Sequence, residues 1–278
     1  MEKPKKKRKI WKILLIVLLS LVVIWAAAVT IIIQTFKAQD EAKKAAMPGN
    51  ADKYAAQNVQ PNPDSPLKGM DILFLGSSVT EGACSMEESF AEYLGKLDGI
   101  NVTKEAVSST TLVDEFSTVA FFYVGDGRSY VARLKENVDT SAHFDAVVIQ
   151  LSTNDASTDK PLGELSDSKS MADFDTKTIT GAIEYLIAYS QETWNCPVIF
   201  YTGTYFESEA YAAMVERLWE IEEKWDIGVI DLYNDKELND IDEDTYNFYM
   251  YDEIHPTRAG YLEWWTPAIE AYLYDYLQ

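Results

Sequence analysis

Beyond residue 69, short apolar runs of strand length alternate with amphipathic segments. Runs of this length that are rich in bulky residues and end at Gly, Ser or Thr are typical of buried strands, whereas apolar residues spaced three and four apart indicate helices. The expected strands are 71–75, a short one near Val102, 145–151, 197–201 and 228–232. The expected helices are one introduced by a capping box at Ser85 and Glu88, then 129–138, 176–194, 208–225 and 257–277, the last kinked at Pro267. This alternation predicts a three-layer α/β domain over residues 69–278, with a five-stranded parallel sheet.

The hydrophobic run near the amino terminus is of a different kind. Residues 13–33 form 21 consecutive positions without a charge, and the first twelve residues hold seven Lys or Arg against one acid, Glu2. A helix crosses a bilayer with about 20 apolar residues, and the positive flank stays inside. The pattern predicts a basic cytoplasmic tail at 1–12, a transmembrane helix at 13–36 and an extracellular domain. A signal peptide cleaved near Ala26–Ala28 is the alternative, but its apolar core is usually shorter, which favours an uncleaved anchor.

Residues 37–68 have a third composition, dominated by Ala, Lys, Gln, Asn and Pro. Such a segment predicts a linker or stalk, whose first turns through Ala42–Ala46 can extend the membrane helix before the chain becomes an extended spacer.

The charge of the chain narrows its partners. Outside the first twelve residues there are 17 basic and 44 acidic side chains, a net charge of −27. A body this acidic repels polyanions, which argues against nucleic acid and favours a neutral or cationic substrate, although solubility alone also accounts for the acidity. The two cysteines, Cys84 and Cys196, either pair outside the cell or remain thiols, and their spacing resembles no metal site.

Polar residues that suit acyl transfer follow several of the expected strands. Ser78 follows the first strand, Ser109 the second and Asn154 the third, and a parallel sheet brings these strand ends to one crevice. Asp252 and His255 come just before the last helix. An Asp three residues before a His can fix the imidazole tautomer and leave the other ring nitrogen to take a proton from a serine. The sequence therefore predicts a triad of nucleophile, general base and orienting carboxylate.

Four blocks of sequence, in this order, resemble those of the SGNH or GDSL hydrolase superfamily. They are Gly76-Ser77-Ser78, Ser109, Asn154-Asp155 and Asp252-x-x-His255-Pro256, and the resemblance covers essentially all of residues 70–278. It implies a flavodoxin-like fold. It also implies an oxyanion hole made of the backbone N–H groups of Ser78 and Ser109 and the side-chain amide of Asn154. We predict no cofactor and no metal.

The chain departs from the family pattern at three positions. The usual Gly-Asp-Ser reads Gly-Ser-Ser here, so Ser77 competes with Ser78 for the role of nucleophile, and register with the motif favours Ser78. Ser109 and Ser152 stand where the family has glycine. The backbone N–H of Ser109 can serve the oxyanion hole only if Ser109 adopts the backbone angles that glycine tolerates freely.

Other polar clusters have plainer explanations. His143 has no partner pattern and is expected to be structural, and Asp240, Asp242 and Asp244 have the spacing of a calcium loop but lack its Gly and final Glu, which favours a solvated loop. Aromatic residues flank the His255 block and are expected to be mostly core.

We expect a membrane-anchored serine esterase that removes small acyl groups, such as acetyl, from carbohydrate or related esters. The same triad would serve an O-acyltransferase on envelope glycan, and a tethered glycan-binding module with a decayed site is the alternative from a different class. No long apolar lid segment is predicted, which disfavours a lipid-directed esterase.

Overall fold

The computed structural model describes residues 4–278, with side chains from residue 9 onward, and has two compact units. The amino-terminal unit ends at Ala46, and the globular unit spans Met47–Gln278.

The amino-terminal unit is one helix, α1 (Pro4–Ala46). Within the described part of the chain, Lys9–Ala46 is the one helix that is long and apolar enough to cross a membrane, with a mean hydropathy of 3.0 in its most apolar window. It extends beyond the predicted span of 13–36 at both ends. Lys, Ala, Gln and Glu are good helix formers, and Pro48 disfavours helical angles at the residue before it, so the helix runs on until that proline.

The second half of the predicted linker belongs to the globular unit. Residues 47–68 form three short 3₁₀ turns, η1 (Pro48–Asn50), η2 (Asp52–Tyr54) and η3 (Ala56–Asn58), and Asn50, Ala56 and Leu67 are buried. Asn50 donates to the carbonyl of Cys84 (2.8 Å) and accepts from the backbone N–H of Arg258 (2.9 Å). The expectation of an extended spacer here was wrong, because these polar residues find partners on the domain surface.

The globular unit is built on a parallel sheet of five strands in the order β2-β1-β3-β4-β5. The strands are β1 (Asp71–Gly76), β2 (Asn101–Ala106), β3 (Ala146–Gln150), β4 (Val198–Tyr201) and β5 (Gly228–Ile230). This sheet confirms the predicted fold class, with each strand within a few residues of its expected position.

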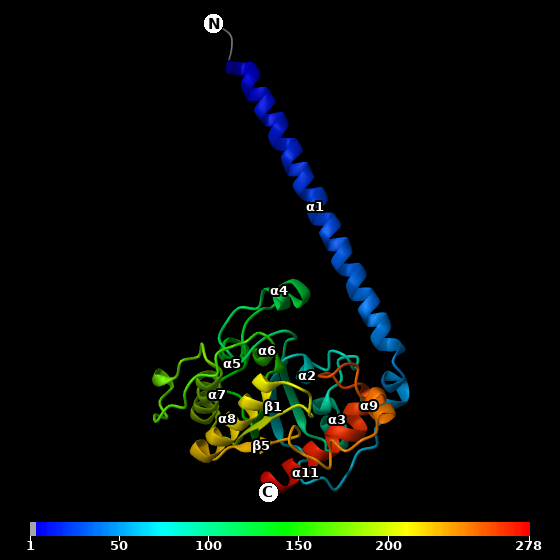
Figure 1. The fold of residues 1–278 in the computed structure, drawn as a ribbon, viewed down its shortest axis with the longest axis vertical. Coiled ribbons are helices and arrows are strands. Elements are labelled where there is room, and N and C mark those ends of the chain that lie inside the picture. Colours follow the sequence, from blue (N-terminus) through cyan, green and yellow to red (C-terminus); the bar gives the residue numbers. More distant parts are fainter. Residues whose placement is uncertain (1–3) are drawn as a thin grey trace. The chain divides into compact units, whose positions relative to one another are not determined.

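Helices cover both faces of the sheet (Figure 1). Leu73 and Leu75 of β1 pack toward α5, α7 and α8, while Ile72 and Phe74 pack toward α3 and α11. Successive strand residues point to opposite faces, so an uninterrupted apolar strand supplies both cores.

The helices of this unit are α2 (Ser78–Glu81), α3 (Phe90–Leu97), α4 (Thr118–Val124), α5 (Tyr130–Asn137), α6 (Thr153–Ser157), the 3₁₀ turn η4 (Met171–Asp173), α7 (Ile179–Trp194), α8 (Glu209–Trp225), α9 (Glu243–Tyr249), α10 (Arg258–Gly260) and α11 (Thr266–Tyr276).

The first crossover helix begins four residues later than predicted. Its capping box is formed by Ser89 and Glu92, while Ser85 bonds the carbonyls of Gly82 and Glu88 in a turn. Both serines are followed three residues later by Glu, so the motif alone did not distinguish them. Ser208 caps α8 as predicted. Helices α4 and α9 were not predicted.

The final helix is interrupted where proline predicts a kink. A π-helical segment, Tyr261–Trp265 (η5), lies between α10 and α11, and Pro267 stands in the first turn of α11. Proline has no N–H to donate to the preceding turn, so a local change of hydrogen-bond pattern is expected just before it.

Candidate active site

The turn after β1 holds Ser78 at the start of α2. A Cβ on Gly76 would lie 1.7 Å from the hydroxyl oxygen of Thr80, so only glycine fits at this position. The side-chain oxygen of Gln150 accepts from the backbone N–H groups of Ser77 (2.9 Å) and Thr80 (3.2 Å). Gln150 is the last residue of β3, the neighbouring strand, so these two hydrogen bonds fix the turn to the sheet.

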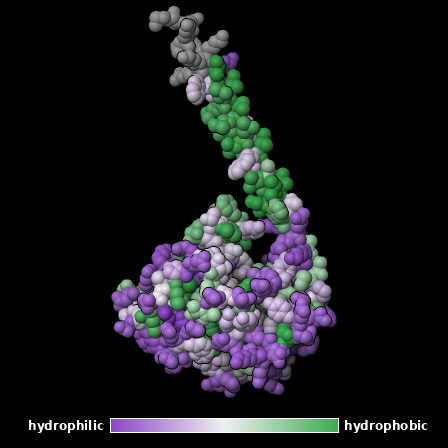
Figure 2. Space-filling view, in the orientation of Figure 1, coloured by the Kyte–Doolittle hydropathy of each residue, from purple (hydrophilic) through white to green (hydrophobic). Residues whose placement is uncertain are grey.

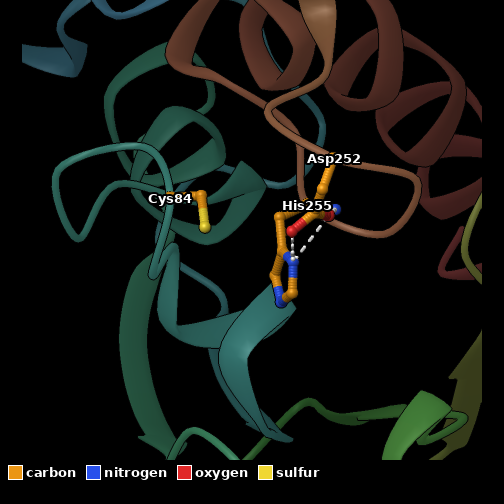
Figure 3. A group of neighbouring side chains, drawn as sticks. All are labelled: Cys84, Asp252 and His255. Carbon is orange, nitrogen blue, oxygen red and sulfur yellow. Dashed lines mark hydrogen bonds and ion pairs between the residues drawn. The ribbon is translucent and has the colours of Figure 1, made fainter. Parts of the chain in front are cut away.

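Three predicted residues form a continuous hydrogen-bond chain. The Oγ of Ser78 lies 2.8 Å from Nε2 of His255. Figure 3 shows the second link, in which Nδ1 of His255 lies 2.8 and 2.9 Å from the two carboxylate oxygens of Asp252. Ser78 itself is 8% exposed. This arrangement lets the imidazole accept a proton from the serine while the carboxylate stabilises the imidazolium that forms.

Asp252 is held in its ionised form. Burial raises the pKa of its carboxyl, but the hydrogen bond and charge of His255 and the backbone N–H groups of Ile254 and His255 outweigh burial and leave the pKa below its ordinary value. Those two N–H groups donate to Oδ1 at 2.9 and 2.8 Å. The carboxylate therefore carries its charge at neutral pH, as an orienting group requires.

Ser77 has a different environment from Ser78. Its side chain is fully buried, and its Oγ lies 3.4 Å from the side-chain oxygen of Gln150. The structure thus brings Ser78, rather than Ser77, to His255.

The two other predicted oxyanion residues line one pocket of about 330 Å³. Ser109 has a φ of 63°, the left-handed conformation that favours glycine. The amide of Asn154 donates to the carbonyl of Thr110 (2.8 Å), which ties α6 to the loop that carries Ser109. The lining residues are Ser109, Thr111, Glu115, Phe116, Ser117, Val119, Asn154, Thr158 and Lys160.

Asp155 holds the same loop through hydrogen bonds to its backbone. Its two carboxylate oxygens accept from the backbone N–H groups of Leu112 (2.8 Å) and Val113 (3.0 Å). Burial raises the pKa of Asp155 to about 6, although hydrogen bonds, including those from these backbone groups, act to lower it.

Sequence reasoning missed Arg133, which braces both strand ends. This fully buried side chain of α5 donates to the carbonyl of Gly76 (2.8 Å) and the hydroxyl of Thr110 (3.1 Å), and it pairs with Glu105 at 2.8 Å. It therefore joins the turn before Ser78 to the loop that carries Ser109. A lone Arg in an amphipathic helix carries no signal of such a role.

Cys84 was also missed as a neighbour of the site. Its sulfur and one ligand atom each of Asp252 and His255 lie within 4.8 Å of one another, and Figure 3 shows the cysteine beside the pair. These are metal-ligand types, but both ring nitrogens of His255 are already hydrogen-bonded, Nδ1 to Asp252 and Nε2 to Ser78. No disulfide joins Cys84 and Cys196 among the described residues.

Two other polar clusters considered in the sequence lie elsewhere. His143 forms a second group of metal-ligand types with Asp71 and Asp145. Asp242, from the calcium-like spacing, caps α9.

The sheet order, the crossover helices and a serine at the end of β1 beside a His–Asp pair define an α/β serine hydrolase. The sequence profile of the GDSL-like lipase/acylhydrolase family matches residues 74–262, and the chain belongs to this family. It is accordingly a serine ester hydrolase. No curated protein matches the sequence.

Solved structures share the fold at low sequence identity. A protein from Lactobacillus plantarum is 17% identical with a TM-score of 0.59, over 75% of this chain and 98% of its own. A lipolytic protein of the G-D-S-L family from Desulfitobacterium hafniense is 17% identical with a TM-score of 0.54, over 74% and 100%. A family two carbohydrate esterase from Clostridium thermocellum, solved with cellohexaose, is 19% identical with a TM-score of 0.51, over 76% and 66%.

Proposed function

We propose that the protein is a membrane-anchored esterase that removes small acyl groups, such as acetyl, from carbohydrate or related esters, with Ser78 as nucleophile, His255 as general base and then acid, and Asp252 as its orienter. The Ser78–His255–Asp252 hydrogen-bond chain carries the proposal. Proton transfer from Ser78 to Nε2 accompanies attack on the ester carbonyl, and the same nitrogen returns the proton to the leaving alcohol.

The negative charge that develops on the carbonyl oxygen needs donors. We assign them to the backbone N–H groups of Ser78 and Ser109 and to the side-chain amide of Asn154. Asn154 has two amide hydrogens, and the bond to Thr110 uses one of them. The other would serve the oxyanion. Water then attacks the acyl enzyme through the same base; if a sugar hydroxyl replaces water, the product is a transferred acyl group.

The substrate class is supported by charge and by location. The acidic globular unit disfavours anionic esters, and α1 suits a single-pass anchor with its basic end in the cytoplasm and the domain outside. The structural similarity to a carbohydrate esterase is in keeping with an acylated glycan.

The test is hydrolysis of p-nitrophenyl acetate by the full chain in detergent. Ser78→Ala and His255→Ala should each lower kcat by about 10⁴-fold or more, since each removes a member of the triad. Ser77→Ala is the matched control and should lose far less. Product analysis with an added glycan acceptor separates hydrolysis from transfer.

An inert wild type that also fails to react with a fluorophosphonate probe, while still binding glycan, would instead support the glycan-binding module. Equal losses in Ser77→Ala and Ser78→Ala would show that the nucleophile is misassigned.

A further inference from the structure

Helix α4 exposes an unusual concentration of apolar side chains beside the candidate site. The α4 patch consists of residues that are 47–65% exposed, namely Phe116, Val119, Phe121, Phe122, Tyr123 and Val124. Of the helix itself only Ala120 is buried, and residues 116–125 carry no charge. Figure 2 shows apolar colour over α4. Exposed apolar patches of this kind mark interaction surfaces.

The α4 patch is continuous with the pocket that holds the proposed oxyanion donors. Phe116 and Val119 line that pocket together with Ser109 and Asn154. The ring of Phe116 contacts Phe121 with centroids 5.6 Å apart, and Phe121 contacts Phe122 at 5.8 Å. An apolar path therefore runs from the pocket to the tip of the helix.

The proposed anchor limits how far the globular unit can lie from a bilayer. The apolar run of α1 ends at Ile33 and the globular unit begins at Met47, so about 13 helical residues, or about 20 Å, separate them. A unit of this size has an expected radius of gyration of about 17 Å, and its width exceeds that separation. If α1 spans a membrane, the globular unit is held at its surface.

Resting on the proposed membrane anchor and esterase activity, we propose that α4 docks on the bilayer interface and that the esters cleaved are amphiphilic ones held at that surface. A run of Phe, Tyr and Val with no charged residue from 116 to 125 suits the interfacial region, where an apolar face is buried among headgroups and acyl chains. The acidic remainder of the unit is repelled by anionic lipid, so docking depends on these side chains and is strongest on zwitterionic lipid. No long apolar lid is predicted from the sequence, and this disfavoured a lipid-directed esterase. The exposed α4 patch offers another way for an amphiphilic ester at a membrane surface to reach the site.

The test places a depth-sensitive probe on α4. The full chain carrying Phe122→Cys, labelled with an NBD fluorophore, is reconstituted in phosphatidylcholine nanodiscs with or without doxyl-labelled lipid. Cys84 and Cys196 are 7% and 8% exposed, and wild type treated in the same way gives the background labelling. Glu216→Cys on the exposed face of α8 is the control. We expect a blue-shifted emission that doxyl lipid quenches at position 122 and an aqueous, unquenched emission at position 216.

The second readout is the ratio of rates on two esters. Phe122→Glu should lower the rate on bilayer-embedded 4-heptadecylumbelliferyl acetate relative to water-soluble 4-methylumbelliferyl acetate by about tenfold or more, and both esters carry the same small acyl group. Glu216→Ala should leave this ratio as in wild type.

The outcomes separate this proposal from the proposed function. A wild type that hydrolyses the soluble acetate overturns the proposal alone if the label at position 122 stays aqueous, if the embedded acetate is not cleaved, or if Phe122→Glu leaves the ratio unchanged. A blue shift that is unquenched by doxyl lipid and depends on protein concentration also overturns it, because a second copy then covers the patch. A wild type inert on both esters fails the proposed function, whatever the label reports.

Discussion

At the scale of single residues, Ser109 shows how a substitution in a family motif changes backbone energetics. The resemblance places glycine where Ser109 stands, and the structure gives this residue a φ of 63°. A side chain with a Cβ is strained there, and only Gly, Asn and Asp adopt such angles readily. Asn154, through its bond to the neighbouring Thr110 carbonyl, holds the loop in this conformation.

Ser109→Gly is expected to stabilise the protein by about 0.5–1 kcal/mol and to retain esterase activity. Relief of the left-handed strain exceeds the added entropy of glycine in the unfolded chain. Urea unfolding of residues 47–278, followed by tryptophan fluorescence, measures the change. Ser109→Ala keeps the Cβ and removes only the hydroxyl, so an equal gain in that variant would show that backbone strain is not the cause.

At the scale of elements, buried charges connect segments that the sequence separates. Arg133 of α5 joins the ends of β1 and β2 to the Thr110 loop, and Asp155 of α6 holds the same loop through two backbone N–H groups. Both are buried, where an unpaired charge is costly, so they specify one arrangement of the loop.

The raised pKa of Asp155, about 6, makes the stability of this connection depend on pH. An aspartate with an unfolded pKa near 3.9 binds more protons when folded, so its contribution favours the folded state below about pH 4 and is lost as the pH rises through about 6. The difference in unfolding free energy between wild type and Asp155→Asn should therefore become less favourable to wild type by about 2–3 kcal/mol from pH 4 to pH 7.

Urea unfolding at several pH values measures this difference, with the exposed Asp159→Asn as a control for general charge effects. A difference between wild type and Asp155→Asn that stays constant from pH 4 to pH 7 would contradict the prediction.

At the scale of the whole molecule, the boundary between the apolar amino-terminal helix and the globular unit lies at Ala46–Met47. Residues 47–68 complete the globular surface. Leu67 is fully buried, Ser65 donates to Asp98 (2.7 Å), and Tyr93 donates to the carbonyl of Tyr54 (2.9 Å). These contacts make the segment part of the folded unit.

A fragment of residues 68–278 should be less stable than one of residues 47–278 by about 3–6 kcal/mol. Burial of Leu67 accounts for about 2 kcal/mol, and several hydrogen bonds add about 1 kcal/mol each. Urea midpoints of the two fragments measure the difference. Equal midpoints would mean that residues 47–67 do not contribute to stability. A third fragment beginning near Gln60 lacks the 3₁₀ turns but keeps Leu67, so it separates their contributions to the free energy of unfolding.

The sequence by itself determined the order of the five strands and their crossover helices, the apolar helix at the amino terminus and the family to which the chain belongs, because these depend on local periodicity and on motifs short enough to read along the chain. The sheet order, the partnership of Arg133 and Asp155, the nearness of Cys84 to His255 and the exposure of α4 were decided only by tertiary structure. In each case residues distant along the chain meet, or fail to meet, across a packed interface. An apolar helix such as α4 has the same sequence pattern whether it is covered or exposed, so only its surroundings in the fold reveal the difference.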